Sequence, residues 1–149
     1  MIRCAKVSDS ATIQTLVNSY AKKGEMLSLS LNDVYERLYE FVLWTENQEV
    51  VGVCALHPMW GDMAEIRSLA VKPEFSNKGI GSQLVGYLLD RAKEMGFSKV
   101  FALTYRQSFF EKNGFKVTDI EHLPKKIWTD CLKCVKYPDC DETAVIINL

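Results

Sequence analysis

The sequence predicts a mixed α/β fold formed by a single domain. Segments with the two-residue alternation of strands alternate with segments that have the spacing of amphipathic helices, and one strong helix lies between two apolar strands. The 149 residues suffice for one hydrophobic core, since 48% of them are hydrophobic and 25% are charged. We therefore expect one domain over residues 1–149, with helices packed on a sheet.

The charge balance and the apolar pattern exclude several functions. Eighteen Lys and Arg residues against nineteen Asp and Glu give a formal net charge of −1, so no basic excess favours nucleic acid or an anionic membrane. No apolar stretch approaches the ~20 residues of a membrane span, and residues 1–6 lack a signal-peptide pattern. We expect a cytoplasmic protein with no nucleic-acid or membrane partner.

The first predicted elements are a short strand over residues 2–7 and a helix. Ser8 or Asp9 can cap this helix, and Gly24 ends it. The apolar residues of the helix recur at helical spacing: Ile13, Leu16, Val17 and Tyr20.

A second helix and a hairpin follow. The helix covers residues 31–39 and begins at Ser30 or Asn32. The hairpin consists of β-rich runs over residues 41–46 and 49–56, joined by Asn47 and Gln48.

The second half of the chain alternates strands and helices. Residues 64–71 are β-rich and stop at Lys72 and Pro73, and a clear amphipathic helix covers residues 79–95 up to Gly96. The remaining expected elements are strands over residues 100–103, 114–117 and 143–147 and a short helix over residues 109–112.

The turn before the strongest helix carries the clearest chemical signal. Gly79 and Gly81 let the backbone approach a ligand closely, and the first N–H groups of the helix lack intrahelical acceptors. These groups and the helix dipole favour phosphate or pyrophosphate, and Lys78 adds a cation. A glycine-rich turn with a helix cap explains the same residues equally well. The pattern is neither a P-loop nor a dinucleotide-binding fingerprint.

Residues 76–81, preceded by Leu69-Ala70-Val71-Lys72-Pro73, make the chain resemble the GNAT superfamily of acetyl-CoA-dependent N-acetyltransferases. In that family a Gln/Arg-x-x-Gly-x-Gly/Ala loop cradles the pyrophosphate of coenzyme A, and Ser76 stands where the long polar residue is usual. A second landmark covers residues 109–115. The resemblance implies a mixed, mostly antiparallel sheet with a splayed pair of parallel strands, flanked by helices.

The resemblance also implies where acetyl-CoA, the cosubstrate, binds. The backbone of Leu69 and Val71 would pair with the pantetheine arm like an added strand, and residues 103–108 would border the acetyl group. The expected cofactor contacts are Leu69, Ala70, Val71, Ser76, Asn77, Lys78, Gly79, Ile80, Gly81 and Ser82.

Acetylation of an amine requires a base, for which Glu65 is the candidate. An ammonium must lose a proton before it attacks, and a carboxylate can accept that proton directly or through water. Family members often place a Glu here, although a strand Glu can equally lie on an exposed face. For the general acid the family often has a Tyr at the position of Phe110, so Tyr105 and Ser108 are the alternatives. The leaving thiolate could also be protonated by water or by the acceptor amine.

Within the superfamily the chain is most similar to short, single-domain N-acetylglutamate synthases of bacterial arginine biosynthesis. The similarity is carried by residues 24–27 before 35–36, by residues 66–71 and 101–105, and by residues 123–128 followed by 130–134 and 140–142. Glutamate carboxylates need cations, which Arg67 and Arg106 could supply, although each could be a surface arginine. Leu29 stands where such synthases usually have Arg. The alternatives are another small amine or peptide N-terminus as acceptor, or an acetyl-CoA sensor without turnover. The family also makes a homodimer plausible.

The five cysteines do not predict a metal site. Cys131, Cys134 and Cys140 could bind zinc with His122, but no second Cys or His pair completes a standard pattern. Buried thiols or an occasional disulfide are favoured for this cluster. Cys4 and Cys54 lie in apolar segments and are expected to be buried.

Overall fold

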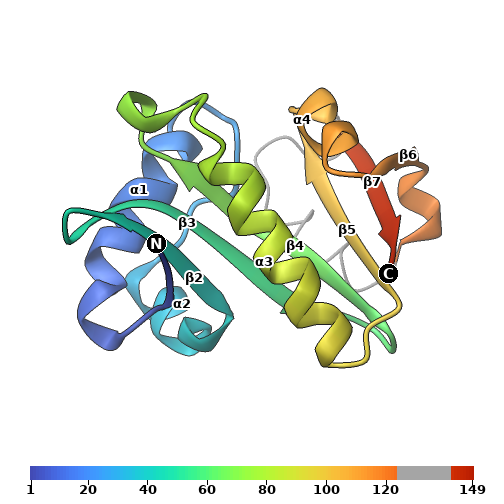
Figure 1. The fold of residues 1–149 in the computed structure, drawn as a ribbon, viewed down its shortest axis with the longest axis horizontal. Helices are drawn as coiled ribbons and strands as arrows, with labels where there is room; N and C mark the ends of the chain where they lie inside the picture. The colour runs from blue at the N-terminus through green and yellow to red at the C-terminus, as the bar shows by residue number, and fades with distance from the viewer. Residues whose placement is uncertain (124–141) are drawn as a thin grey trace. The chain divides into compact units, whose positions relative to one another are not determined.

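The computed structural model of the chain describes residues 1–123 and 142–149. Within these residues, seven strands form one mixed sheet in the order β1-β2-β3-β4-β5-β7-β6 (Figure 1). β4 and β5 pair in parallel, whereas the pairs β1–β2, β2–β3, β5–β7 and β6–β7 are antiparallel. This arrangement confirms the predicted mixed α/β class.

The element bounds agree with the sequence to within a few residues. The strands are β1 Ile2–Cys4, β2 Phe41–Glu46, β3 Glu49–Pro58, β4 Met63–Val71, β5 Lys99–Thr104, β6 Lys116–Thr118 and β7 Thr143–Asn148. The α-helices are α1 Ser10–Ala21, α2 Leu31–Glu36, α3 Ile80–Glu94 and α4 Gln107–Lys112. None of the helices in the described part of the chain is long and apolar enough to cross a membrane.

The chain divides into two compact units. Unit 1 consists of Met1–His57 and Ile66–Leu88, and unit 2 consists of Pro58–Glu65 and Leu89–Leu149. All three division points fall inside regular elements, namely β3, β4 and α3.

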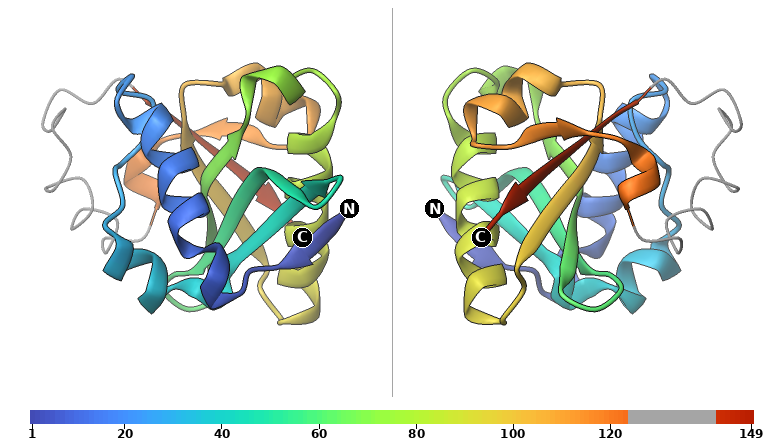
Figure 2. Two further views of the ribbon diagram at one scale, coloured as in Figure 1. Left: turned by 90° about the vertical axis from the view of Figure 1, so that its left-hand side faces the viewer. Right: turned by 90° about the vertical axis from the view of Figure 1, so that its right-hand side faces the viewer.

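The core of unit 1 lies between the first two helices and the sheet. α1, drawn in blue in Figure 2, covers one face of β2 and β3. Apolar residues from five elements meet there because their spacing places them on one side of each helix or strand. The buried members are Ile13, Leu16, Val17, Val34, Phe41, Leu43, Val50, Val53, Ala55 and Ala70.

The first turn of α3 packs closely on β3 at Gly52. A Cβ atom at residue 52 would lie 3.2 Å from Ile80 Cγ2 and 3.3 Å from Leu84 Cδ1. Ile80 and Leu84 are themselves buried. The missing side chain of Gly52 therefore sets how near the beginning of α3 comes to the sheet.

Unit 2 is built around β5 and β7, which pair along their whole lengths (Figure 2). The start of β4 joins this unit through the pairs Met63–Lys99, Ala64–Val100 and Glu65–Phe101. Phe101, Leu123 and Ala144 are buried together in its core. The parallel pairing expected from the family resemblance is thus present at the start of β4.

The starts of α1 and α2 are stabilised differently. Ser30 caps α2 as predicted, because its Oγ accepts the Asp33 N–H at 3.0 Å while the Asp33 carboxylate accepts the Ser30 N–H at 2.9 Å. Asp9 occupies the cap position of α1, but its carboxylate accepts the Lys6 N–H at 2.7 Å and two bonds from the Arg3 guanidinium at 2.7 and 2.9 Å. The Asp9 side chain therefore closes the 3₁₀ turn before α1.

Two local predictions are wrong. The second helix ends at Glu36, and a 3₁₀ turn over Leu38–Glu40 replaces its last turn. This turn brings the buried Glu40 carboxylate to 2.9 Å from His57 Nδ1, a tertiary contact that helical periodicity does not reveal. Cys4 is exposed because β1 lies at the edge of the sheet, whereas Cys54 is buried as predicted. Burial raises the pKa of the Cys54 thiol.

The Arg3–Asp9 pair predicts a specific loss of stability in acid. Hydrogen bonding from Arg3 lowers the pKa of the Asp9 carboxyl, so the pair stabilises the fold above the ordinary Asp pKa of about 3.9, and this contribution disappears as the pH falls through the folded-state value. Asp9→Asn should lower the free energy of unfolding at pH 7 by about 1–3 kcal/mol.

Urea unfolding of the Asp9→Asn variant at pH 7 and pH 3 checks this expectation. The difference from the parent protein should be smaller at pH 3, and the matched change of the exposed Asp90 to Asn should leave both values unchanged. An equal loss at both pH values would contradict the role of the charge.

Candidate active site

The residues predicted for acetyl-CoA binding all lie in unit 1. They comprise the end of β4, the loop that follows and the first turn of α3, and Arg67 lies on the same part of β4. Glu65, Tyr105, Arg106 and Ser108 lie in unit 2.

The end of β4 is held from two neighbouring elements. The Tyr20 hydroxyl at the end of α1 donates a hydrogen bond to the Val71 carbonyl. The Lys72 N–H donates to the Val51 carbonyl at 2.8 Å, and the Lys72 ammonium lies 2.8 Å from Glu49 Oε1. Val51 is available because Trp44 pairs with Gly52 and Thr45 pairs with Val50, which leaves Val51 as a β-bulge. The exit from β4 therefore has a defined direction.

Ser68 interrupts β4 before this exit. Its φ of +53° places a non-glycine residue in the left-handed region within a strand, a conformation that costs roughly 1–2 kcal/mol. Such strain persists where the surrounding structure imposes it, commonly at functional sites. Nothing in the strand pattern of residues 64–71 predicted it.

The loop after β4 is shaped by its own backbone. A 3₁₀ turn over Pro73–Phe75 is closed by Ser76, whose Oγ donates to the Pro73 carbonyl at 2.7 Å. Asn77 and Gly79 then adopt φ values of +61° and +80°, which these two residue types tolerate best. α3 begins at the next residue, with Gln83 N–H donating to the Gly79 carbonyl at 3.1 Å.

This geometry fits an anionic ligand at the start of α3. Residues 76–79 are exposed, whereas Ile80 is buried and fixes the first turn. The N–H groups of a first helical turn lack intrahelical acceptors and lie at the positive end of the dipole. The Lys78 ammonium lies 5.2 Å from the centroid of the Phe75 ring, beside the same turn. The positive φ values on both sides of Lys78 are those of a tight turn of Asn and Gly residues.

Glu65 is a buried carboxylic acid, with only 7% of its surface exposed. It is the last residue of β4 in the parallel ladder and lies opposite Phe101 of β5. The alternative of an ordinary exposed strand residue is therefore wrong. A buried carboxyl group is a suitable proton acceptor when its surroundings match its pKa to the working pH.

The residues after β5 are placed by Thr104. Its buried Oγ1 accepts the Arg106 N–H at 2.8 Å, which turns the chain from β5 into α4. Tyr105, Arg106 and Ser108 are exposed in this turn. Thr104 was not predicted as a site residue, since a Thr at a strand end carries no chemical signature of its own.

The Phe110 side chain is buried and packs against other aromatic rings. It is 5% exposed, and its ring lies 5.1 Å from those of Phe109 and Phe115 in edge-to-face geometry. The position at which the family often has an acidic Tyr hydroxyl is thus part of the core of unit 2.

Leu29 in the loop between α1 and α2 is also a structural residue. Its backbone exchanges two hydrogen bonds of 2.9 Å with the Asn18 side-chain amide, and its carbonyl accepts a third from Gln14 at 3.3 Å. The Leu29 side chain packs against the core of unit 1. The sequence predicted the missing cation at this position but not the clamp from α1.

The predicted cysteine cluster cannot be placed, because Cys131, Cys134 and Cys140 lie outside the described residues. Among residues 1–123 and 142–149, no group of three His, Cys, Asp or Glu side chains is arranged to hold a metal ion.

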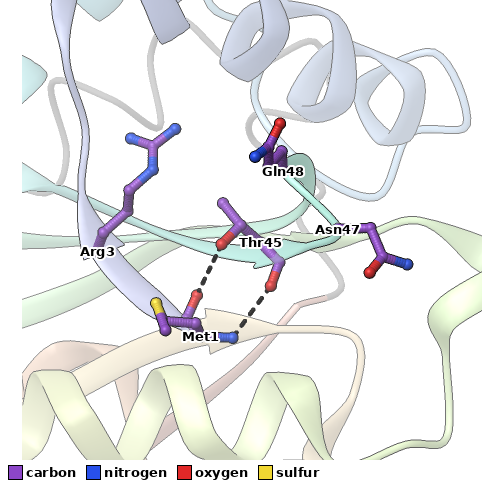
Figure 3. Close-up of a pocket in the computed structure, with 5 residues that line it drawn as sticks. All are labelled: Met1, Arg3, Thr45, Asn47 and Gln48. Carbon is purple, nitrogen blue, oxygen red and sulfur yellow. Dashed lines mark hydrogen bonds between the residues drawn. The ribbon is translucent and has the colours of Figure 1, made fainter.

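A separate hollow lies at the edge of the sheet beside β1. Figure 3 shows Met1 bonded to Thr45 there: its ammonium donates to the Thr45 carbonyl at 3.1 Å, and its carbonyl accepts from Thr45 Oγ1 at 3.4 Å. The hollow is lined by Met1, Arg3, Thr45, Asn47 and Gln48, none of which is a predicted site residue. Its two cationic groups are engaged in bonds that fix the first strand.

Sequence comparisons identify relatives along nearly the whole chain. An uncharacterized N-acetyltransferase of Chlorobaculum tepidum is 38% identical over 148 residues, which is 99% of this chain and 96% of that protein. An amino-acid acetyltransferase of Mycobacterium tuberculosis is 39% identical over 129 residues, which is 83% of this chain and 71% of that protein. The amino-acid acetyltransferase of Shewanella oneidensis is longer: the match, at 31% identity, spans only 28% of it.

Solved structures with the same fold include proteins with bound coenzyme A. A Mycobacterium tuberculosis protein in complex with CoA has a TM-score of 0.85 at 29% identity, covering 100% of this chain and 99% of that one. The N-acetylglutamate synthase of Neisseria gonorrhoeae, complexed with coenzyme A and N-acetyl-glutamate, has a TM-score of 0.91 at 25% identity, covering 100% of this chain and 35% of that one.

The turn before α3 and the parallel β4–β5 pair therefore belong to a known architecture. The acetyltransferase (GNAT) family matches residues 12–115, which include the end of β4, the loop and α3. The chain belongs to this family and is an acetyl-CoA-dependent N-acetyltransferase.

Proposed function

We propose that the protein transfers the acetyl group of acetyl-CoA to the α-amine of an amino acid, with glutamate as the leading acceptor. The observation that carries this proposal is the 39% identity, over most of the chain, to an amino-acid acetyltransferase. The likeness to an N-acetylglutamate synthase at a TM-score of 0.91 supports glutamate. The place of such a reaction would be the first acetylation step of arginine biosynthesis.

The loop and the end of β4 would bind the cosubstrate. The N–H groups at the start of α3 would receive the pyrophosphate, with Lys78 providing a second positive charge. Leu69 and Val71 would pair with the pantetheine arm through their backbones, as a β-strand pairs with a neighbour. The thioester of acetyl-CoA supplies an activated acetyl group.

Glu65 would start the reaction by accepting a proton from the acceptor ammonium, directly or through a water molecule. The free amine would then attack the thioester carbonyl carbon within a ternary complex, so that a C–N bond forms and the C–S bond breaks. Tyr105 or Ser108 would protonate the leaving thiolate, and Arg67 and Arg106 would bind the carboxylates of the acceptor.

A different acceptor is the second candidate, favoured by Leu29. A partly buried apolar side chain that packs against the core replaces an expected cation in the loop between α1 and α2. One fewer charge for the side-chain carboxylate of glutamate would favour a smaller or less acidic amino acid, another amine or a peptide N-terminus.

A thiol-release assay with acetyl-CoA and each of the twenty amino acids tests the proposal. Preferential turnover of glutamate supports the leading acceptor, and preferential turnover of another amino acid selects the second candidate. CoA binding without turnover of any amine would overturn the proposal and indicate a sensor. Light scattering of the purified protein would test the expected homodimer.

Replacing Glu65 by Gln should remove the proposed base while preserving the size of the side chain. We expect kcat at neutral pH to fall by about 10²–10⁴-fold, with the dissociation constant of CoA close to that of the parent protein. Steady-state kinetics and calorimetric CoA titration measure the two quantities. Glu94→Gln, on an exposed position of α3, is the matched control, and parental turnover in Glu65→Gln would exclude the assigned role.

Replacing Gly81 by Glu should block the pyrophosphate position with bulk and negative charge. CoA binding should fall below detection in calorimetry, because the new carboxylate lies in the first turn of α3. Gly86→Glu provides the same charge further along α3, at a position where a Cβ has no neighbour within 4 Å. CoA affinity equal to that of the control would contradict the assigned anion site.

A further inference from the structure

The peptide group between Val71 and Lys72 is bonded at both of its polar ends. Its carbonyl accepts the hydroxyl of Tyr20, and its N–H donates to the Val51 carbonyl at 2.8 Å. These two partners come from α1 and β3. Because the six atoms of a peptide group are coplanar, two such bonds fix the rotation of the whole plane.

The Tyr20 side chain is itself held in place, so its hydroxyl can fix the Val71 carbonyl. It lies in the last turn of α1, where its ring packs against the core of unit 1. The Lys23 ammonium lies 5.4 Å from the ring centroid, which adds a cation–π contact. These contacts hold the Tyr20 hydroxyl at the carbonyl of Val71, which lies 51 residues later in the chain.

The bonded carbonyl belongs to the part of β4 that is proposed to bind the pantetheine arm. A carbonyl oxygen has two lone pairs, so the bond from Tyr20 leaves one available for a second donor. An amide N–H of an added strand is such a donor. The orientation of the remaining lone pair depends on the plane that Tyr20 and Val51 hold in place.

We propose that Tyr20 is a positioning residue for acetyl-CoA: its hydroxyl orients the Val71 carbonyl to receive an amide N–H of the pantetheine arm. The inference rests on the binding mode given under Proposed function. A preoriented acceptor binds more tightly because less conformational freedom is lost on association.

The Tyr20→Phe variant tests this role, since it removes only the hydroxyl and keeps the ring. We expect the dissociation constant of CoA and the KM for acetyl-CoA to rise about two- to tenfold, the range for one neutral hydrogen bond, with kcat close to that of the parent protein. Tyr39→Phe is the matched control, because Tyr39 is 72% exposed.

A truncated ligand separates positioning from a general effect on the fold. Adenosine 3′-phosphate 5′-diphosphate carries the pyrophosphate but lacks the pantetheine arm, so its affinity should be equal in Tyr20→Phe and the parent protein. Equal weakening of both ligands, or unchanged CoA affinity, would overturn the inference. Failure of the parent protein itself to bind CoA would instead refute the proposed function.

Discussion

The hydrogen bond between the Lys72 N–H and the Val51 carbonyl fixes the end of β4, from which the proposed cofactor-binding loop begins. Val51 lies at the bulge of β3 and bonds to the exit of β4, and a salt bridge between Lys72 and Glu49 reinforces the same junction. Because the loop begins at this junction, these contacts fix the direction in which the chain leaves β4. The 3₁₀ turn and the start of α3 follow from that direction.

A second constraint acts on the other end of the loop. Gly52 lies next to Val51 in β3, and its missing side chain admits Ile80 and Leu84. Two adjacent residues of one strand thus determine both where the loop starts and how closely the helix packs. Between these fixed ends, Asn77 and Gly79 provide the left-handed backbone that a short connection requires.

In each unit, a polar side chain forms hydrogen bonds with the backbone of a turn or loop. Thr104 turns the chain after β5 by accepting a backbone N–H, and Asn18 holds the loop at Leu29 in the same way. In both places the backbone groups lie outside helices and strands, so a side chain satisfies their hydrogen bonds instead of another backbone group. These contacts keep the proposed acceptor-binding segments in defined conformations while leaving Tyr105 and Arg106 exposed.

Most of the architecture could be predicted from local patterns. The alternation in residues 49–56 and the apolar stripe of residues 79–95 depend on which side chains face the core. The hairpin at Asn47 and Gln48 follows from two β-rich runs separated by two residues. The early end of α2 could not be predicted, because the buried Glu40–His57 contact that accompanies it joins residues 17 positions apart.

By itself, the sequence determined the class of fold, the family and the glycine-rich turn before α3, since all three depend on residue types at short spacing. Only the tertiary structure decided that Glu65 and Phe110 are buried, that Leu29 packs against a core, and that Tyr20 bonds to Val71. The physical reason is that burial and hydrogen bonding join segments far apart in the chain, and no local pattern records which partner a side chain will meet.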